Sequence, residues 1–183
     1  MIPIQRKIIV RILTALVVCT LFSCKDNFKE VQKSTFAEFN ASGEADSINI
    51  KYTDSGKIKS ILISPKMLDY ASVEFPFTEF PKGVNVTLYD DHGKRTFVNS
   101  KYAVTFKNTD LIDLQGKVKI TNETGQIFET EQLYFDQKNE WFYTEKRYKF
   151  TDPKGVSFGE GIDFSKDFKI INSQNVSGEV EKQ

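Results

Sequence analysis

Residues suited to catalysis or metal binding are scarce in this sequence. Its 183 residues include one histidine and two cysteines. The histidine, His92, lies in the polar stretch Asp90-Asp91-His92-Gly93, where a solvent-exposed turn residue is expected rather than a ligand or a general base. A single imidazole leaves serine nucleophiles without a partner and metal ions without enough ligands. We therefore predict that the protein is not an enzyme and that it has no metal site and no cofactor.

An excess of charge of one sign is also absent, since 25 lysines and arginines balance 25 acidic residues. No basic stripe is present that could follow nucleic-acid phosphates, so we predict no nucleic-acid partner. Paired carboxylates such as Asp90 and Asp91, or Asp163 and Asp167, could in principle act on a sugar. A turn explains the first pair and a strand end explains the second, which argues against that role.

The chain begins with the pattern of a secretory leader. Arg6, Lys7 and Arg11 precede every acidic residue and are followed by the apolar run Ile12–Phe22. The next residues complete Leu21-Phe22-Ser23-Cys24, which resembles the bacterial lipobox, where the leader is cut before a cysteine that is then acylated. The alternative is an uncleaved membrane anchor. Its apolar run would be shorter than the roughly 20 residues that a bilayer core requires, so we predict a signal peptide over residues 1–23.

Lipidation explains the two cysteines better than a disulfide does. Cys19 lies within the leader and Cys24 at the predicted cut, so the mature chain keeps one cysteine, which acylation blocks. Two or three fatty chains on Cys24 would anchor the protein stably in a membrane, whereas a single chain binds only marginally. Without the leader, 22 basic residues face 25 acidic ones, a formal charge of −3.

The remaining 160 residues suit one domain with a sizeable core. Residues 24–45 are polar and are predicted to form a tether and docking segment. From residue 46 onward, apolar and polar residues alternate with a period of two, and no run of 12 residues carries a helical stripe. We therefore predict an all-β domain over residues 46–183.

A polar turn ending in glycine interrupts the β-rich sequence four times. These glycines are spaced by 37, 32 and 30 residues, and aligning them also aligns apolar residues, such as Val86 with Val118 and Phe128 with Phe158. The repetition predicts a stack of antiparallel hairpins. Such a stack could close on itself or fold over as two sheets. The four glycines are Gly56, Gly93, Gly125 and Gly155.

The alternation also predicts where the strands lie. Prolines 65, 76 and 81 bracket the aromatic stretch Tyr70–Phe80, which is predicted to be an irregular connection or an edge strand because proline cannot serve a central ladder. The predicted strands are Ser47–Tyr52, Lys57–Ile63, Val84–Tyr89, Thr96–Phe106, Asp110–Ile120, Ile127–Asp136, Glu140–Phe150, Val156–Phe164 and Ile170–Glu179.

The aromatic content is high, with 16 phenylalanines, seven tyrosines and one tryptophan. Packing of an ordinary core is the simplest explanation, because aromatic residues favour strands. Glycines nevertheless occur within the strand patterns, at Gly116, Gly161 and Gly178, where they weaken a sheet unless a bulge, a bend or a close ligand requires them. Large side chains interspersed with gaps suit a groove better than a tightly filled core.

Several short motifs occur in order along the chain, the strongest being Leu-x-Gly-x-Val at 114–118, Gly-x-x-x-x-Thr-x-x-Leu at 125–133 and the terminal Val-x-Gly. Together they resemble the LptC family, the periplasmic component of the lipopolysaccharide export ABC transporter, here in a lipoprotein-like form. The likeness covers most of the chain from Gly43 to Val180. Besides the lipobox, its residues are Lys25–Phe28, Gly43–Asp46, Phe75–Phe77, Leu114–Val118, Glu129–Leu133 and Val176–Val180.

The resemblance implies an antiparallel β-jellyroll with an open, slot-like cross-section of the OstA/LptA-like type. It also implies a bridge in the periplasm, anchored to the inner membrane, that receives lipopolysaccharide from the ABC transporter LptBFG at its N-terminal edge. An LptA-like protein would take the lipid at the C-terminal edge. Well-known members keep an uncleaved transmembrane helix where this sequence has the predicted lipidated Cys24.

On this interpretation the inward side chains line the path of the lipid. Alternation selects Val86, Leu88, Tyr102, Val104, Phe106, Ile112, Leu114, Val118, Ile120, Phe128, Leu133, Phe135, Tyr148, Phe150 and Phe158. The last strand should keep a free outer edge for a partner strand, with Ile170, Val176, Gly178 and Val180 as candidate residues. Two alternatives stay open: a lipid or lipoprotein carrier with a closed cavity, and a carbohydrate-active surface lipoprotein.

Overall fold

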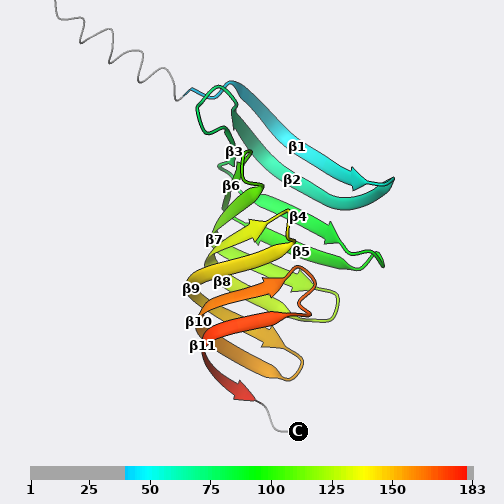
Figure 1. The fold of residues 1–183 in the computed structure, drawn as a ribbon, viewed down its shortest axis with the longest axis vertical. Helices are drawn as coiled ribbons and strands as arrows, with labels where there is room; N and C mark the ends of the chain where they lie inside the picture. Colours follow the sequence, from blue (N-terminus) through cyan, green and yellow to red (C-terminus); the bar gives the residue numbers. More distant parts are fainter. Residues whose placement is uncertain (1–39, 181–183) are drawn as a thin grey trace, which may run out of the picture. The chain divides into compact units, whose positions relative to one another are not determined.

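A computed structural model describes residues 40–180, which form one antiparallel sheet of eleven strands (Figure 1). No helix occurs among these described residues. The predicted all-β antiparallel fold is thus confirmed, while the slot-like cross-section stays a prediction. The strands are β1 Gly43–Asp54, β2 Lys57–Tyr70, β3 Phe77–Phe80, β4 Val84–Tyr89, β5 Arg95–Ser100, β6 Tyr102–Phe106, β7 Leu111–Asn122, β8 Ile127–Asp136, β9 Trp141–Asp152, β10 Gly155–Ser165 and β11 Ile171–Val180.

Two predictions from the sequence concern residues outside those that the structure describes: the signal peptide over 1–23 and the lipidated Cys24. Most of the predicted tether and docking segment lies there too. The compact unit that contains the strands begins at Asn40.

The four polar turns predicted from the sequence join strands of this sheet. Gly56, Gly93 and Gly125 adopt φ values of 76°, 79° and 83°, a conformation that glycine reaches without steric cost. In the third turn, Asn122 Oδ1 accepts hydrogen bonds from the backbone N–H groups of Thr124 at 3.1 Å and of residue 126 at 3.0 Å. Asp90 and Asp152 accept from backbone N–H groups in the same way, so three of the four turns are specified by an acceptor side chain at the start and a glycine near the end.

Most strands bend sharply near their middle. The first half of β7, from Leu111 to Gln115, pairs with β6, and the second half, from Lys119 to Asn122, pairs with β5. Between the halves lies a bulge in which Gly116 has a φ of 73°. β8 and β10 have comparable register shifts. The strand therefore leaves one half of the sheet and enters the other, and we call the row of bends the fold line.

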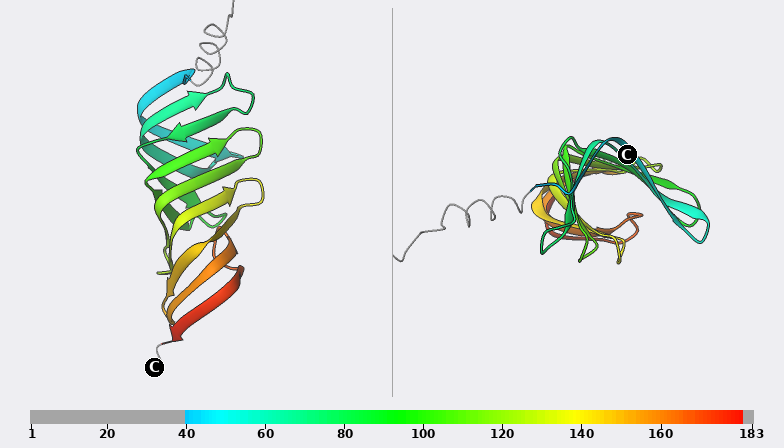
Figure 2. Two further views of the ribbon diagram at one scale, coloured as in Figure 1. Left: turned by 90° about the vertical axis from the view of Figure 1, so that its left-hand side faces the viewer. Right: turned by 90° about the horizontal axis from the view of Figure 1, so that it is seen from above.

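The fold line divides the sheet into two walls that face each other (Figure 2). β3 and β4 are the two halves of one bent strand, and β5 and β6 are the two halves of the next. With these pairs counted as single strands, the chain is a simple up-and-down meander. Wall A consists of residues 48–63, 84–100, 118–130, 148–160 and 175–180. Wall B consists of residues 43–46, 66–80, 102–115, 133–144 and 162–173.

Buried hydroxyl groups satisfy the backbone where the ladder is interrupted at the fold line. Thr130 Oγ1 donates to the carbonyl oxygen of Arg147 at 2.8 Å, and Thr144 Oγ1 donates to that of Gln132 at 2.7 Å. In β2, Ser64 is 1% exposed and donates to the carbonyl oxygen of Gly83 at 2.8 Å. An unpaired buried carbonyl would be costly, so these three short side chains stabilise the bend.

Two predicted strand boundaries are wrong because of the fold line. The single strand Thr96–Phe106 is broken at Lys101, whose N–H donates to the carbonyls of both Gln115 and Gly116 at 3.1 and 3.0 Å. The stretch Tyr70–Phe80 contains β3, which is paired on both sides, with β2 and with β6, and is not an edge strand. Pro76 and Pro81 stand just outside β3, where no ladder donor is needed. Pro65 lies within β2, which continues to Tyr70 and so passes the predicted end at Ile63.

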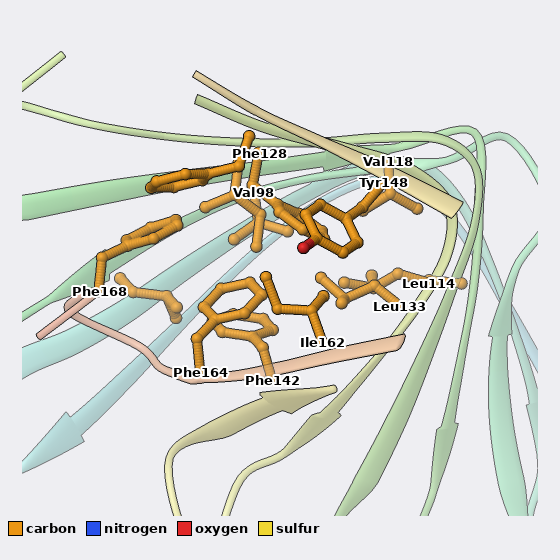
Figure 3. Close-up of a cluster of buried hydrophobic side chains, with 14 of the residues drawn as sticks. Val98, Leu114, Val118, Phe128, Leu133, Phe142, Tyr148, Ile162, Phe164 and Phe168 are labelled. Atoms are coloured by element: carbon orange, nitrogen blue, oxygen red, sulfur yellow. The ribbon is translucent and has the colours of Figure 1, made fainter. Parts of the chain in front are cut away.

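Aromatic side chains fill the interior between the walls at β8, β9 and β10 (Figure 3). Phe128 of wall A and Phe164 of wall B are at most 1% exposed, and their ring centroids lie 4.8 Å apart. Phe142 stacks on Phe164 at 5.3 Å. Phe128 and Phe164 join the two walls, because each ring packs on a ring from the opposite half of the sheet, and Phe142 extends this stack within wall B.

The close approach at the fold line can be tested with two glycines of similar conformation. Gly83 has a φ of +82°, and a Cβ there would lie 2.4 Å from the carbonyl oxygen of Ser100, whereas Gly56 has a φ of +76° with nothing within 4 Å. Gly56→Ala should cost about 1–2 kcal/mol through backbone strain alone. Gly83→Ala should lose about 1–3 kcal/mol more, because the backbone must also shift.

Urea unfolding of both variants measures this difference. Equal losses for the two substitutions would mean that β4 and β5 do not approach each other closely at the fold line.

Candidate functional site

The space between the walls is hollow at the end formed by β2 to β7. A cavity with a volume of about 640 Å³ lies there, and most of its walls are apolar. Its volume falls within the roughly 300–1,000 Å³ that ligand pockets usually occupy. Its apolar lining residues are Ile50, Tyr52, Leu62, Met67, Phe80, Val84, Val86, Leu88, Val98, Ala103, Ile112, Leu114, Phe135 and Phe142.

The two walls contribute to this cavity through the alternation of their strands. Val86 and Leu88 of β4 point inward from wall A, and Ile112 and Leu114 of β7 point inward from wall B. Neighbouring residues such as Thr87 point to the outer face, because successive side chains of a strand lie on opposite sides. The apolar lining thus follows from the period of two that the sequence shows.

Four lysines stand at the polar margin of the cavity, and three of them, Lys59, Lys107 and Lys166, pair with an acidic side chain. Lys59 Nζ lies 2.6 Å from Asp91 Oδ1, and Lys107 Nζ lies 2.7 Å from Asp69 Oδ1. Lys166 pairs with the Glu140 carboxylate. The cavity therefore combines an apolar interior with a charged margin, an arrangement that suits an amphiphile with anionic groups.

The pair formed by Lys107 and Asp69 changes the titration of the acid. The hydrogen bond from Lys107 lowers the pKa of the Asp69 carboxyl below its ordinary value, against the opposing effect of burial, and the Thr78 hydroxyl adds a second hydrogen bond at 2.9 Å. The carboxylate form is thus favoured in the folded protein.

The ribbon of β1 and β2 extends the apolar surface beyond the cavity. Ile50, Tyr52 and Ile58 are 44%, 62% and 42% exposed, and the first two also line the cavity. By the register of the pair, all three occupy the same face of the ribbon as Leu62. An apolar face that continues out of a cavity marks a surface for an apolar ligand or a partner.

The structure divides the predicted groove residues into three groups. Val86, Leu88, Ile112, Leu114 and Phe135 line the cavity. The second group lies between the walls within the filled half, where each side chain is at most 9% exposed: Val118, Ile120, Phe128, Leu133, Tyr148 and Phe150.

The prediction is wrong for the third group, Tyr102, Val104, Phe106 and Phe158, because these residues lie on the outer face of the sheet and do not point inward. In β6 the inward residues are Ala103 and Thr105, which line the cavity, so Tyr102, Val104 and Phe106 face outward. The break at Lys101 shifts the alternation by one residue, and a continuous strand would have kept it. Burial and the neighbouring carboxylate of Glu79 raise the pKa of Tyr102 to about 12.

Phe158 is the fourth of these corrected residues. It is 48% exposed on the outer face, and Gly159 takes the inward position beside Tyr148. A Cβ at Gly159 would lie 2.5 Å from the Tyr148 hydroxyl oxygen, so only glycine fits beneath that ring. At the bulge around Gly161 the alternation shifts by one residue and again matches the predicted pattern, so Ile162 points inward.

The predicted partner edge lies at the end of the sheet. β11 is paired with β10 and has no second neighbour among residues 40–180, and β1 likewise pairs with β2 alone. Val176 is 61% exposed in β11, which also contains Gly178 and Val180. Ile170 is 55% exposed in the preceding turn.

The residues considered for catalysis have structural partners. Asp90 Oδ1 accepts hydrogen bonds from the backbone of His92 at 2.9 Å and of Lys94 at 2.8 Å. Asp163 accepts from Trp141 Nε1 at 3.0 Å, and Asp167 accepts from the Ser165 hydroxyl. Among the described residues, no group of three or more acidic, histidine or cysteine side chains could hold a metal ion.

Residues Gly155–Gly159 also fit the Gly-x-Ser-x-Gly spacing of serine-hydrolase nucleophiles. Ser157, however, lies within β10 and pairs with Phe150 of β9, whereas that motif requires a turn between a strand and a helix. The match is therefore one of spacing alone.

Other cavity residues were not predicted from the sequence. Phe80 lies in the stretch predicted to be an irregular connection or an edge strand, and Ala103 and Thr105 follow the break at Lys101, which shifts the alternation. The lysines at the margin carry no pattern of their own, since they come from different turns and strand ends. Only the folded chain brings them to one opening.

Similarity to a known family indicates what this cavity, which lies between two strands with free edges, could hold. The chain matches the family described as "Lipopolysaccharide-assembly, LptC-related" over residues 8–181. The chain belongs to the LptC family. None of the curated proteins compared with the chain matches it.

LptC proteins take part in lipopolysaccharide transport on the periplasmic side of the cell envelope, and theirs is a transport family rather than an enzyme family. A lipid cargo agrees with the apolar lining of the cavity. Within residues 40–180 there is no helix with the length and apolar character to cross a bilayer.

We predict that the Asp69–Lys107 pair makes the free energy of unfolding depend on pH in the acidic range. The folded pKa of Asp69 lies below its ordinary value of 3.8, so the pair stabilises the protein above that pH and the contribution disappears as the pH falls through the folded pKa. Asp69→Asn should therefore lower the free energy of unfolding at pH 6 and leave it nearly unchanged at the lowest pH reached. Urea unfolding over a pH series measures the effect.

A Lys107→Gln background supplies the control, because Asp69→Asn should then change the pH dependence much less, with only the Thr78 hydrogen bond left to favour the carboxylate. If the substitution had the same effect with and without Lys107, the ion pair would not be its cause.

Proposed function

We propose that this protein is a periplasmic bridge subunit of the lipopolysaccharide export machinery. It receives lipopolysaccharide from the inner-membrane ABC transporter LptBFG and passes it to an LptA-like protein. The single observation that supports this function best is the apolar cavity between the walls, which lies between two strands with free edges.

The physical need for such a bridge follows from the cost of exposing acyl chains. Each methylene transferred to water costs about 0.8 kcal/mol, so one chain of about 12 carbons would cost roughly 10 kcal/mol, and lipid A carries several chains. A covered apolar path removes most of this cost. The ATPase of the transporter supplies the energy, and this subunit supplies the path.

The charges at the cavity margin fit the other part of the cargo. Acyl chains would occupy the space lined by Val86, Leu88 and Leu114, while Lys59 and Lys107 face the anionic groups of the lipid at the margin. Both lysines have acidic partners on the protein, so lipid phosphates would exchange with existing ion pairs. This exchange holds the headgroup loosely, as transport requires.

The two free edges suit docking at both ends of the bridge. β1 would pair with the transporter and β11 with the LptA-like protein, each by adding a strand to the sheet. Anchoring through acylated Cys24 places the domain at the periplasmic face of the inner membrane. Residues 24–45 then act as tether and docking segment, with the jellyroll domain following them.

A photo-crosslinking residue placed in the cavity tests the proposed cargo. At Val86, which points inward, it should capture lipopolysaccharide, and at the neighbouring Thr87, which points outward, it should not. Both positions lie on β4, so the two variants differ only in the face that they probe. Capture from position 87 and not from position 86 would overturn the proposal.

The partner edge is tested by proline at position 176. Val176→Pro should abolish capture of the LptA-like protein and spare most of the fold, because proline disrupts strand addition and β11 is a terminal strand. Val176→Thr keeps the backbone N–H and should bind normally. A pull-down with purified partner measures capture, and unchanged binding by the proline variant would count against the edge.

The filled interior at β8 to β10 favours a second candidate, a lipid or lipoprotein carrier with a closed cavity. A carrier should remain monomeric when mixed with an LptA-like protein, whereas a bridge should assemble with it end to end. The pull-down therefore separates the two functions.

A further inference from the structure

The cavity does not continue into the half of the domain that leads to β11. Phe135 and Phe142 line its inner end, and their ring centroids lie 4.4 Å apart. Phe142 stacks on Phe164, and Phe164 on Phe168 at 4.9 Å. A row of stacked rings therefore stands between the hollow and the filled halves.

Phe168 differs from the other rings of this row because a turn, and not a strand, carries it. It is 5% exposed, lies in the turn between β10 and β11, and stacks on Phe150 of wall A at 5.9 Å. In Figure 3 its ring points into the interior toward Phe128. A turn can change its backbone conformation without breaking a ladder, so this ring can leave the interior more easily than those of the strands.

Within the turn, Ser165 N donates to the carbonyl oxygen of Ile170 at 3.0 Å and Phe168 N to that of Ser165 at 2.9 Å. The turn is joined to other strands by the ion pair of Lys166 with Glu140 and by two further hydrogen bonds. Lys166 N donates to the carbonyl oxygen of Glu140 at 3.0 Å, and Thr96 Oγ1 donates to the carbonyl oxygen of Lys166 at 3.4 Å. Phe168 itself has a φ of 59°, which is uncommon for a bulky residue. The contact with Thr96 joins this turn of wall B to wall A, opposite the fold line.

Space lies on both sides of the turn. A second cavity of about 420 Å³ is lined by Phe168, Thr96 and residues of the turns around Asp90 and Asn122. Leu88 and Lys166 line both this cavity and the large one. Outward movement of the turn would connect the two spaces and open the interior beside Phe150.

We propose that residues 165–170 form a gate and that Phe168 controls the passage of acyl chains from the cavity toward β11. This inference rests on the proposed function, since it concerns the route of the lipid within the bridge. With the gate closed, the chains remain in the cavity between β2 and β7. With the gate open, they reach the inner face of β9 and β10.

Two photo-crosslinking positions in the full chain separate binding from passage. A probe at Val86 reports on the cavity, and a probe at Ser157, whose backbone pairs with Phe150, reports on the inner face beyond Phe168. With purified lipopolysaccharide alone, position 86 should capture lipid and position 157 should capture little. If the open turn is populated at about 10%, Phe168→Ala should raise capture at position 157 about tenfold and leave position 86 unchanged.

The matched control is Phe158→Ala, which removes a phenylalanine from the outer face of the same region. It should change neither signal. Absence of capture at position 86 in every variant would overturn the proposed function. Capture at position 86 together with equal capture at position 157 in the parent and in Phe168→Ala would overturn the gate alone.

A disulfide that can be formed and reduced tests the gate even if the Phe168→Ala variant fails to fold. Glu140→Cys with Lys166→Cys places two thiols where the backbones already share a hydrogen bond of 3.0 Å, within reach of a disulfide. Oxidation should remove the residual capture at position 157, and reduction should restore it. The double variant lacks the Lys166–Glu140 ion pair at the cavity margin, so capture at position 86 is compared only between its oxidised and reduced forms, where it should be equal. Lys166→Cys alone should not respond to oxidation, and a locked protein that still delivers lipid to position 157 would refute the gate.

Discussion

The structure depends on the fold line, where strands leave one wall and enter the other. At each crossing the ladder must stop and restart, so backbone carbonyls lose their partners inside the protein. Hydroxyl groups of Thr130, Thr144 and Ser64 replace those partners, and Gly116 supplies the φ value that a bulge requires. Without these local solutions the sheet would stay open, and neither the filled core nor the cavity would have a second wall.

The two halves of the interior have opposite properties for one physical reason, the size of the inward side chains. Between β8 and β10 the inward positions carry large rings, and Phe128 meets Phe164 across the walls. Between β2 and β7 smaller residues such as Val84, Val98 and Ala103 line a space that they do not fill. The rings hold the walls together at one end, which permits a cavity at the other. A lipid bridge needs both, because an interior that is hollow throughout would lose its cross-wall contacts.

Much of the fold could be predicted from local chemistry. Turns with an acceptor side chain and a glycine occur where the sequence indicated, and the strand Val84–Tyr89 has the predicted bounds. The errors at the candidate site arise from shifts of one residue. The break at Lys101 turned a predicted inward face of β6 outward, and Gly159 displaced Phe158 from the interior. A bulge shifts the alternation by one residue, so the pattern before a bulge does not predict which residues point inward after it.

The sequence by itself determined the β class, the repeated turns and membership of the LptC family, because these depend on residues close together in the chain and on their order. Only the tertiary structure decided which residues meet across the walls. Lys59 lies in β2, Lys107 follows β6, and Lys166 and Phe168 share the turn after β10, so their positions follow from where each strand bends. Bends are set by hydrogen bonds between distant segments, such as Ser64 with Gly83, and such pairs leave no local pattern.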